Sequence, residues 1–196
     1  MPADRFSLPG APRVAFQGER GAFGDEAARR WRADAVPLPV PTFDAVPAHV
    51  VAGAADAGVL PVENRIAGPV AEARGALDAA LAAGALAVVG EVRVPVALCL
   101  LALPGASPAG VRVVRSHPVA LAQCGAFLRA RPALVVEPWW DTAGAARDVA
   151  AGGDPAVGAI ASALAAGRWG LTVLARGVQD VADNWTRFVV VARSGG

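Results

Sequence analysis

Short apolar runs alternate with helical patterns over the first half of the chain. Each run is short enough for one strand, and each helical pattern carries apolar residues at helical spacing. The pattern predicts three strand–helix units, with strands over 13–17, 36–40 and 57–62 and helices over 25–33, 44–54 and 70–83. Strands that alternate with helices are typical of an α/β fold with a mostly parallel sheet.

The middle of the chain interrupts this alternation. Residues 86–105 form a long β-rich stretch without a helix, and the alternation restarts after it. The second set comprises expected strands over 111–115, 134–137, 157–160, 172–177 and 188–192 and helices over 118–129, 142–151 and 162–169.

Two sets of units around one connector predict two similar α/β lobes joined by crossover strands, an architecture like that of type II periplasmic binding proteins. We expect a flexible tail over 1–12, a first lobe over 13–88 with 176–196, and a second lobe over 89–175. Proteins of this plan bind small ligands in the cleft between the lobes, at the carboxyl ends of strands.

Composition narrows the function classes. Hydrophobic residues make up 55% of the chain and charged residues 18%, which indicates a folded globular protein. The net charge is +1 and the Arg residues are scattered, which argues against a nucleic-acid-binding surface. The chain has no Lys, which excludes a Schiff-base lysine and a P-loop lysine.

Cysteine and histidine usage argues against a metal site. The chain has two Cys and two His without ligand spacing, so we expect no bound metal. Both Cys lie in apolar runs, which favours buried, unreactive thiols.

The chain shows no segment that predicts export or a membrane span. Its first residues lack the apolar core of a signal peptide, and no apolar run reaches the roughly 18–20 residues of a spanning helix. We therefore expect a cytoplasmic protein without a membrane partner.

Amide side chains are rare in this sequence, and they gather beside the expected turns. There are two Asn and three Gln, and all lie in or next to turns that adjoin strands. The glycine-rich turn over 17–28 could bind an anion at a helix N-terminus or could be an ordinary βα turn. Gln123 could be a solvated helical side chain or a site residue. Ser116 is expected to cap the helix that follows it, with Pro118 in the first turn.

Six segments, in order along nearly the whole chain, resemble the catalytic domain of prephenate dehydratase. The Asn-x-Thr-Arg-Phe sequence near the end is the most specific of them. The segments are GERGAFGDEAA (18–28), PVENRIAG (61–68), RSHPVALAQC (115–124), TAGAA (142–146), AIAS (159–162) and VQDVADNWTRF (178–188).

The resemblance implies a hydro-lyase that removes CO₂ and the C4 hydroxide from prephenate to give phenylpyruvate, in phenylalanine biosynthesis. It implies no metal and no organic cofactor. It also implies prephenate as the small-molecule partner and a homodimer or a higher homo-oligomer.

Roles are carried over at the matching positions. Thr186 would donate to the leaving hydroxyl, by hydrogen bonding or through a relay, and Asn64 and Gln123 would hydrogen-bond the ring hydroxyl or the carboxylates. Arg187 would pair with a carboxylate or brace the loop, and Phe188 would pack under the site. The remaining substrate-binding set comprises the backbone amides around Gly21 together with six further residues. These are Phe23, Glu63, Arg65, Ser116, Thr142 and Ser162.

Four positions depart from the family pattern within these segments. They are Ala22, Arg65, Pro69 and Asp141, each in place of a hydroxyl-bearing residue of the family. We hypothesise that Arg65 faces the substrate and adds a partner for a carboxylate. That partner would favour prephenate over arogenate, which carries an ammonium group.

The family commonly carries a regulatory ACT domain after the catalytic domain. This chain ends nine residues after Arg187, so we expect no ACT domain and no phenylalanine feedback within it.

Two alternatives remain open on the sequence alone. One is a prephenate decarboxylase that does not aromatise its product, although Asn64 and Thr186 speak against a reaction that must keep the hydroxyl. The other is a non-catalytic two-lobed protein that binds an aromatic or keto acid.

Overall fold

The computed structural model describes residues 10–194, which fall into two compact units. Unit 1 consists of Met1–Gly18, Phe23–Pro95 and Trp185–Gly196, and unit 2 of Glu19–Ala22 and Val96–Asn184. Of the expected tail, residues 1–9 lie outside the described part. Ala11 and Pro12 are anchored, because the Ala11 amide donates to Asp34 and the Pro12 carbonyl accepts from Val36.

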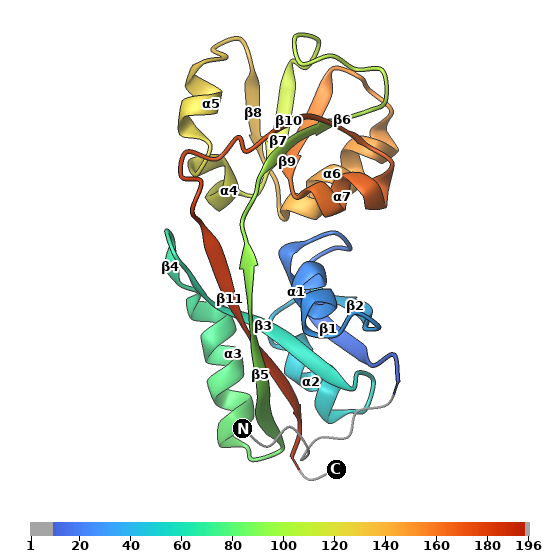
Figure 1. Cartoon of the computed structure of the whole chain (residues 1–196), viewed down its shortest axis with the longest axis vertical. Helices are drawn as coiled ribbons and strands as arrows, with labels where there is room; N and C mark the ends of the chain where they lie inside the picture. Colours follow the sequence, from blue (N-terminus) through green and yellow to red (C-terminus); the bar gives the residue numbers. More distant parts are fainter. Residues whose placement is uncertain (1–9, 195–196) are drawn as a thin grey trace. The chain divides into compact units, whose positions relative to one another are not determined.

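Unit 1 is a mixed sheet with three helices (Figure 1). The strands run in the order β2-β1-β3-β11-β5, and β4 pairs with β3. Strand β1 is parallel to β2 and β3, whereas β11 is antiparallel to both β3 and β5. The elements are β1 (Arg13–Gln17), α1 (Phe23–Trp31), β2 (Val36–Val40), α2 (Ala45–Val51), β3 (Ala57–Asn64), β4 (Gly68–Pro69), α3 (Ala71–Ala82), β5 (Leu86–Pro95) and β11 (Trp185–Arg193).

Alternation along β1 shows how the two faces of this sheet are covered. Ala15 belongs to a core cluster with residues of α2 and α3, such as Val46 and Leu77. Its neighbour Phe16 points to the opposite face, because successive side chains of a strand alternate. There it lies against Gly24 of α1, where a Cβ would come within 3.0 Å of the Phe16 ring.

Unit 2 is a second mixed sheet with four helices, in the strand order β10-β6-β9-β7-β8. Strand β7 is parallel to β8 and β9, and β6 is antiparallel to β9 and β10. The elements are β6 (Cys99–Ala102), β7 (Val113–Ser116), α4 (Pro118–Ala122), α5 (Gly125–Arg129), β8 (Val135–Pro138), α6 (Thr142–Gly152), β9 (Val157–Ala161), α7 (Ala163–Trp169) and β10 (Thr172–Arg176).

The α/β class is confirmed, but neither sheet is mostly parallel as the alternation predicted. The reason lies in the connectivity. Strand β6 comes three residues after β5, and β11 comes eight residues after β10, and in each case the preceding strand belongs to the other sheet. Neither strand is reached through a crossover helix from its own sheet, so each can enter its sheet in the antiparallel direction.

The helix expected over 118–129 is two short helices. Cys124 adopts φ −113° and ψ 27°, which ends α4, and the Asp180 carboxylate accepts from the amides of Gly125 and Ala126 to begin α5. The cap of α4 was also predicted wrongly. His117 is the N-cap residue, and its Nδ1 accepts from the Val119 amide, whereas Ser116 lies in β7.

The unit boundaries lie at Pro95/Val96 and Asn184/Trp185, not at the expected 88/89 and 175/176. Strand β5 stays in unit 1 to its end because it pairs with β11 as far as Pro95. Residues after β10 stay in unit 2 because Val178 and Gln179 are both hydrogen-bonded to Leu98.

Among the described residues, no helix has both the length and the apolar character needed to cross a membrane.

Candidate active site

Asn64 and Thr186 form a buried polar pair in unit 1. Strands β3 and β11 place them opposite each other in antiparallel register. Nδ2 of Asn64 donates to Oγ1 of Thr186 over 3.0 Å, and the side chains are 8% and 9% exposed. The Thr186 oxygen is therefore an acceptor towards Asn64, and its own proton is left for another partner.

The orientation of the Asn64 amide is fixed from its other end. Oδ1 accepts from the backbone amides of Ile66 and Ala67, at 3.0 and 2.9 Å, in the turn between β3 and β4. Only Nδ2 is then left to face Thr186 and the Trp185 carbonyl. This turn chemistry explains why an Asn, with an acceptor and a donor on one short side chain, occupies the end of β3.

Arg187 lies on the other face of β11 from Thr186. Its Nε donates to Glu63 over 3.3 Å and its Nη1 to Glu91 over 2.9 Å, so it links the neighbouring strands β3 and β5. Phe188 is buried beside it. The resemblance offered two roles for Arg187, to pair with a carboxylate or to brace the loop. In the structure its guanidinium meets two carboxylates of the protein, on the neighbouring strands.

The remaining expected residues of unit 1 lie at element ends. Arg65 follows Asn64 in the β3–β4 turn, with an exposed side chain and a backbone amide that donates to the Trp185 carbonyl. Phe23 is the first residue of α1 and is half-buried.

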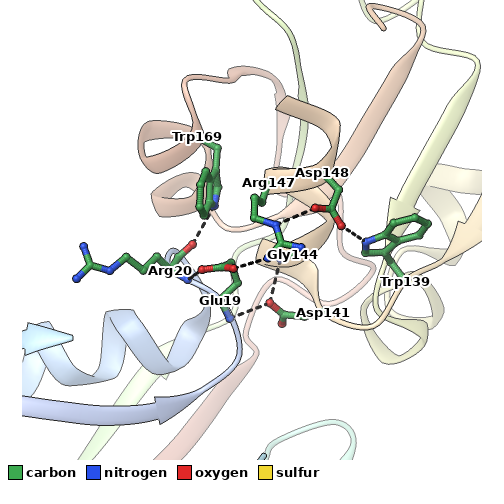
Figure 2. Close-up of polar contacts among 8 residues, drawn as sticks. All are labelled: Glu19, Arg20, Trp139, Asp141, Gly144, Arg147, Asp148 and Trp169. Carbon is green, nitrogen blue, oxygen red and sulfur yellow. Dashed lines mark hydrogen bonds and ion pairs between the residues drawn. The ribbon is translucent and has the colours of Figure 1, made fainter. Parts of the chain in front are cut away.

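Within the glycine-rich turn, the segment Glu19–Ala22 belongs to unit 2. Its Glu19 and Arg20 amides are paired within the protein (Figure 2), and so is the Ala22 amide. The Glu19 amide donates to the Asp141 carboxylate, the Arg20 amide to the Glu19 carboxylate, and the Ala22 amide to the Glu19 carbonyl. Anionic groups do meet the Glu19 and Arg20 amides, but they are side chains of this chain. A substrate anion therefore has no free set of amides at Glu19, Arg20 and Ala22.

Side chains from α6 and α7 hold this turn in place. Arg147 donates to Glu19 over 2.7 Å and to Asp148 over 2.8 Å, and Trp169 donates to the Arg20 carbonyl over 3.0 Å (Figure 2). Gly21, at φ +93°, lies so close to α7 that an added Cβ would be 2.7 Å from the Ala165 Cα. Sequence reasoning gave no signal for Glu19 or Arg147, because each contact joins distant segments.

Asp141 caps α6 with its carboxylate, which accepts from the Gly144 amide over 3.0 Å as well as from Glu19. Burial raises the pKa of this carboxyl above its ordinary value, although the hydrogen bonds from Gly144 and Glu19 act in the opposite direction. The N-terminus of α6, where Thr142 is the first helical residue, thus already holds an anionic side chain.

The hydroxyl protons of Ser116 and Ser162 are used inside unit 2. Ser116 donates to the Ile160 carbonyl over 2.6 Å, and Ser162 donates to the Gly21 carbonyl over 2.7 Å while it caps α7. Each hydroxyl has one proton, so neither serine offers a donor to a ligand in this conformation. Both were expected to hold the anionic ends of the substrate.

Gln123 lies at the end of α4 and contacts Asn184. Nδ2 of Asn184 donates to Oε1 of Gln123 over 3.1 Å. Gln123 is therefore more than a solvated helical side chain. Asn184 is part of the Asn-x-Thr-Arg-Phe sequence that predicted a site, but the sequence assigned no individual role to it.

The thiols are buried and free, and burial raises the pKa of Cys124 to about 12 and that of Cys99 above its ordinary value. Within residues 10–194 no His, Cys, Asp and Glu side chains gather in a group that could hold a metal ion.

Comparison with known proteins adds a family match. The family model for prephenate dehydratase matches residues 14–195. Chloroplastic arogenate dehydratase 5 of Arabidopsis thaliana is 41% identical over 92% of this chain and 42% of its own length. A bifunctional N-acyl-homoserine lactone acylase/prephenate dehydratase of Komagataeibacter europaeus is 41% identical over 92% of this chain and 62% of its own length. The chain thus spans less than half of the first of these relatives.

Solved structures agree in fold. A prephenate dehydratase from Arthrobacter aurescens in complex with L-Phe superposes with a TM-score of 0.82 at 31% identity, over 94% of this chain and 61% of that one. A structure described as a novel type of quorum-quenching acylase gives a TM-score of 0.84 at 38% identity, over 94% of this chain and 65% of that one.

Proposed function

This chain belongs to the prephenate dehydratase family, and we propose that it converts prephenate to phenylpyruvate, CO₂ and water. The family assignment covers dehydratases of prephenate and of arogenate. We add to that assignment the choice of prephenate as the substrate and of phenylalanine biosynthesis as the pathway, and both are part of the proposal. The hydrogen bond from Asn64 to Thr186 is the observation that carries it.

The reaction needs little covalent help from the protein. The electron pair of the bond between the ring and the carboxylate moves into the ring as CO₂ leaves. The C4–O bond breaks with its electron pair on oxygen, and that oxygen takes up one proton from the solvent, relayed through the Thr186 hydroxyl, to leave as water. Aromatisation drives both steps, so a catalyst has to orient the dianion and assist the leaving hydroxide.

Thr186 is the residue that we assign to the leaving oxygen. Its Oγ1 already accepts from Asn64, so its proton can point only to another acceptor. The amide of Asn64 also stabilises negative charge that develops on Oγ1 as the proton moves towards the substrate. Assistance of this kind accelerates a reaction by roughly 10² to 10⁴.

The substrate's carboxylates need hydrogen-bond donors or cations from the protein. Gln123 accepts from Asn184 through Oε1, which leaves its Nε2 as a donor. Arg65, next to Asn64 in the chain, adds a guanidinium for a carboxylate. Ser116 and Ser162 are not part of this proposal, because their protons go to backbone carbonyls.

The test is incubation of the purified chain with prephenate at neutral pH, with the product followed by ultraviolet absorbance and mass. Phenylpyruvate is the expected product. A Thr186→Val variant, which removes the hydroxyl and keeps the branched shape, should lose it. A non-aromatic decarboxylated product would point to the decarboxylase instead, and unchanged prephenate bound by the protein would point to a binding protein.

A further inference from the structure

Asn184 carries a buried acceptor that the described part of the protein leaves unused. Its side chain is 3% exposed, and its Oδ1 has no hydrogen-bond partner among residues 10–194. Buried carbonyl oxygens are rarely left unpaired, because water is lost from them without compensation. An oxygen of this kind in a candidate site points to a partner outside the chain.

The surrounding backbone keeps this side chain in place. The Asn184 carbonyl accepts from the Val96 amide over 2.9 Å, and the Asp180 amide donates to the Gln123 carbonyl over 2.7 Å. The Asp180 carboxylate is in turn bound to the first amides of α5. The segment that carries Asn184 is therefore tied to the α4–α5 junction that carries Gln123.

The two amides together present one acceptor and one donor. Nδ2 of Asn184 holds Oε1 of Gln123 over 3.1 Å, which fixes the rotation of the Gln123 amide. Nε2 is then the end of the Gln123 amide that is left to donate, and Oδ1 of Asn184 has no donor within the described residues. A ligand that meets this pair must supply the complementary groups.

We propose that Asn184 is a substrate-binding residue, whose Oδ1 accepts a hydrogen bond from an O–H or N–H of the substrate while its Nδ2 positions Gln123. This inference rests on the proposed dehydratase function. Prephenate at neutral pH has a single donor, its C4 hydroxyl, because its other polar groups are carboxylates and a ketone. Arogenate has the same hydroxyl and an ammonium group in addition, so these two groups are the possible sources of the hydrogen bond.

Steady-state kinetics on both substrates test the proposal with Asn184→Leu, Gln123→Leu and the double variant. Asn184→Leu should lower kcat/KM for prephenate at least about tenfold. An equal loss on arogenate assigns the bond to the C4 hydroxyl, and a larger loss on arogenate assigns it to the ammonium. The double variant should be slower than Gln123→Leu alone, because it loses the contact through Oδ1 of Asn184 in addition to the Gln123 amide itself.

Gln179→Leu is the matched control. Gln179 is an amide of the same segment, and its Oε1 accepts from the Leu98 amide over 2.9 Å, a contact that does not involve Gln123. Its removal should lower the melting temperature and leave kcat/KM within about threefold of the wild type.

Two outcomes overturn the proposal. One is a folded Asn184→Leu variant with kcat/KM within about threefold of the wild type. The other is a double variant no slower than Gln123→Leu, which would reduce Asn184 to a support for Gln123. If Asn184→Leu does not fold, Asn184→Ala replaces it. That variant also lacks both Oδ1 and Nδ2, so an unchanged kcat/KM for prephenate would equally refute the proposal.

The proposed function can fail separately. If the wild type turns over neither substrate, calorimetry of prephenate binding to the wild type and to Asn184→Leu, or to Asn184→Ala if the first variant does not fold, decides the role of Asn184. Weaker binding by the variant supports the contact, and equal binding refutes it.

Discussion

The amide of Asn64 donates to the hydroxyl oxygen of Thr186 over 3.0 Å, although the two residues lie 122 positions apart in the chain. Strands β3 and β11 bring them opposite each other, and the turn after Asn64 fixes which end of its amide faces the threonine. In this pair the Thr186 hydroxyl accepts a hydrogen bond from Asn64 and keeps its own proton to donate to another group. This arrangement gives the first of four predictions.

Asn64→Asp should reverse the direction of the hydrogen bond. The aspartate keeps an oxygen for the amides of Ile66 and Ala67, but its other oxygen can only accept, so the Thr186 proton turns towards it. We expect kcat for prephenate to fall by roughly 10² to 10⁴ while the fold persists. Steady-state kinetics and thermal unfolding provide the measurement. Adding Thr186→Val should slow the variant little further, and a large additional loss would mean that Asn64 acts independently of Thr186.

Arg65→Ser should change the substrate preference. If the guanidinium meets a substrate carboxylate, its removal should lower kcat/KM for prephenate by about tenfold, the size of a charge-assisted hydrogen bond. The ratio of kcat/KM for prephenate over arogenate should fall, because the ammonium of arogenate gains nothing from a nearby cation. Arg74→Ser removes the same charge from an exposed position on α3 and is the control. An unchanged ratio in Arg65→Ser would refute the hypothesis.

Gly21→Ala should destabilise unit 2. Gly21 has φ +93°, and an added Cβ would lie 2.7 Å from the Ala165 Cα. Gly105→Ala is a matched control, since Gly105 has φ +87° and no atom within 4 Å of the added Cβ. The control should cost about 1–2 kcal/mol for the backbone conformation alone. Gly21→Ala should cost about 1–3 kcal/mol more from the steric overlap. Equal losses in urea unfolding would show that α7 can move away from the turn.

Asp141→Asn should show a pH-dependent gain in stability. Burial raises the pKa of the Asp141 carboxyl, so the folded state binds the proton more tightly than the unfolded state does. The stability contributed by that carboxyl is full below its ordinary pKa of about 3.9 and is lost as the pH rises through the raised value. The asparagine keeps an N-cap oxygen and carries no charge. Its advantage over the wild type should therefore be largest near about pH 7 and should shrink towards about pH 4.

Asp34→Asn is the control with the opposite sign. A hydrogen bond from Arg32 holds the pKa of Asp34 well below its usual range, so its contribution is present above the ordinary pKa and is lost in acid. Free energies of unfolding from urea titrations across this pH range provide the measurement. An Asp141→Asn variant that is less stable than the wild type at neutral pH would contradict the expected gain.

The sequence by itself determined the α/β class and most of the strands and helices. Local patterns carry this information, because an apolar run of strand length and a periodic helical stretch are each contained in a few neighbouring residues. The Asn-Trp-Thr-Arg-Phe sequence at 184–188 likewise pointed to Thr186 before any contact was known. The parallel character of the sheets and the unbroken helix over 118–129 were predicted wrongly. Strand direction depends on distant connections, and the break at Cys124 depends on the Asp180 carboxylate.

Only the tertiary structure decided what each polar side chain does. Ser116, Ser162 and the turn at Gly21 had suitable sequence positions for an anion, yet their donors meet carbonyls and carboxylates of the protein itself. Asn64 donates to the hydroxyl oxygen of Thr186, which leaves the hydroxyl proton of Thr186 as a donor. In the same way Asn184 donates to Oε1 of Gln123, which leaves Nε2 of Gln123 as a donor. A hydroxyl or an amide has few hydrogen-bonding positions, and which of them remain for a substrate depends on neighbours that are remote in sequence.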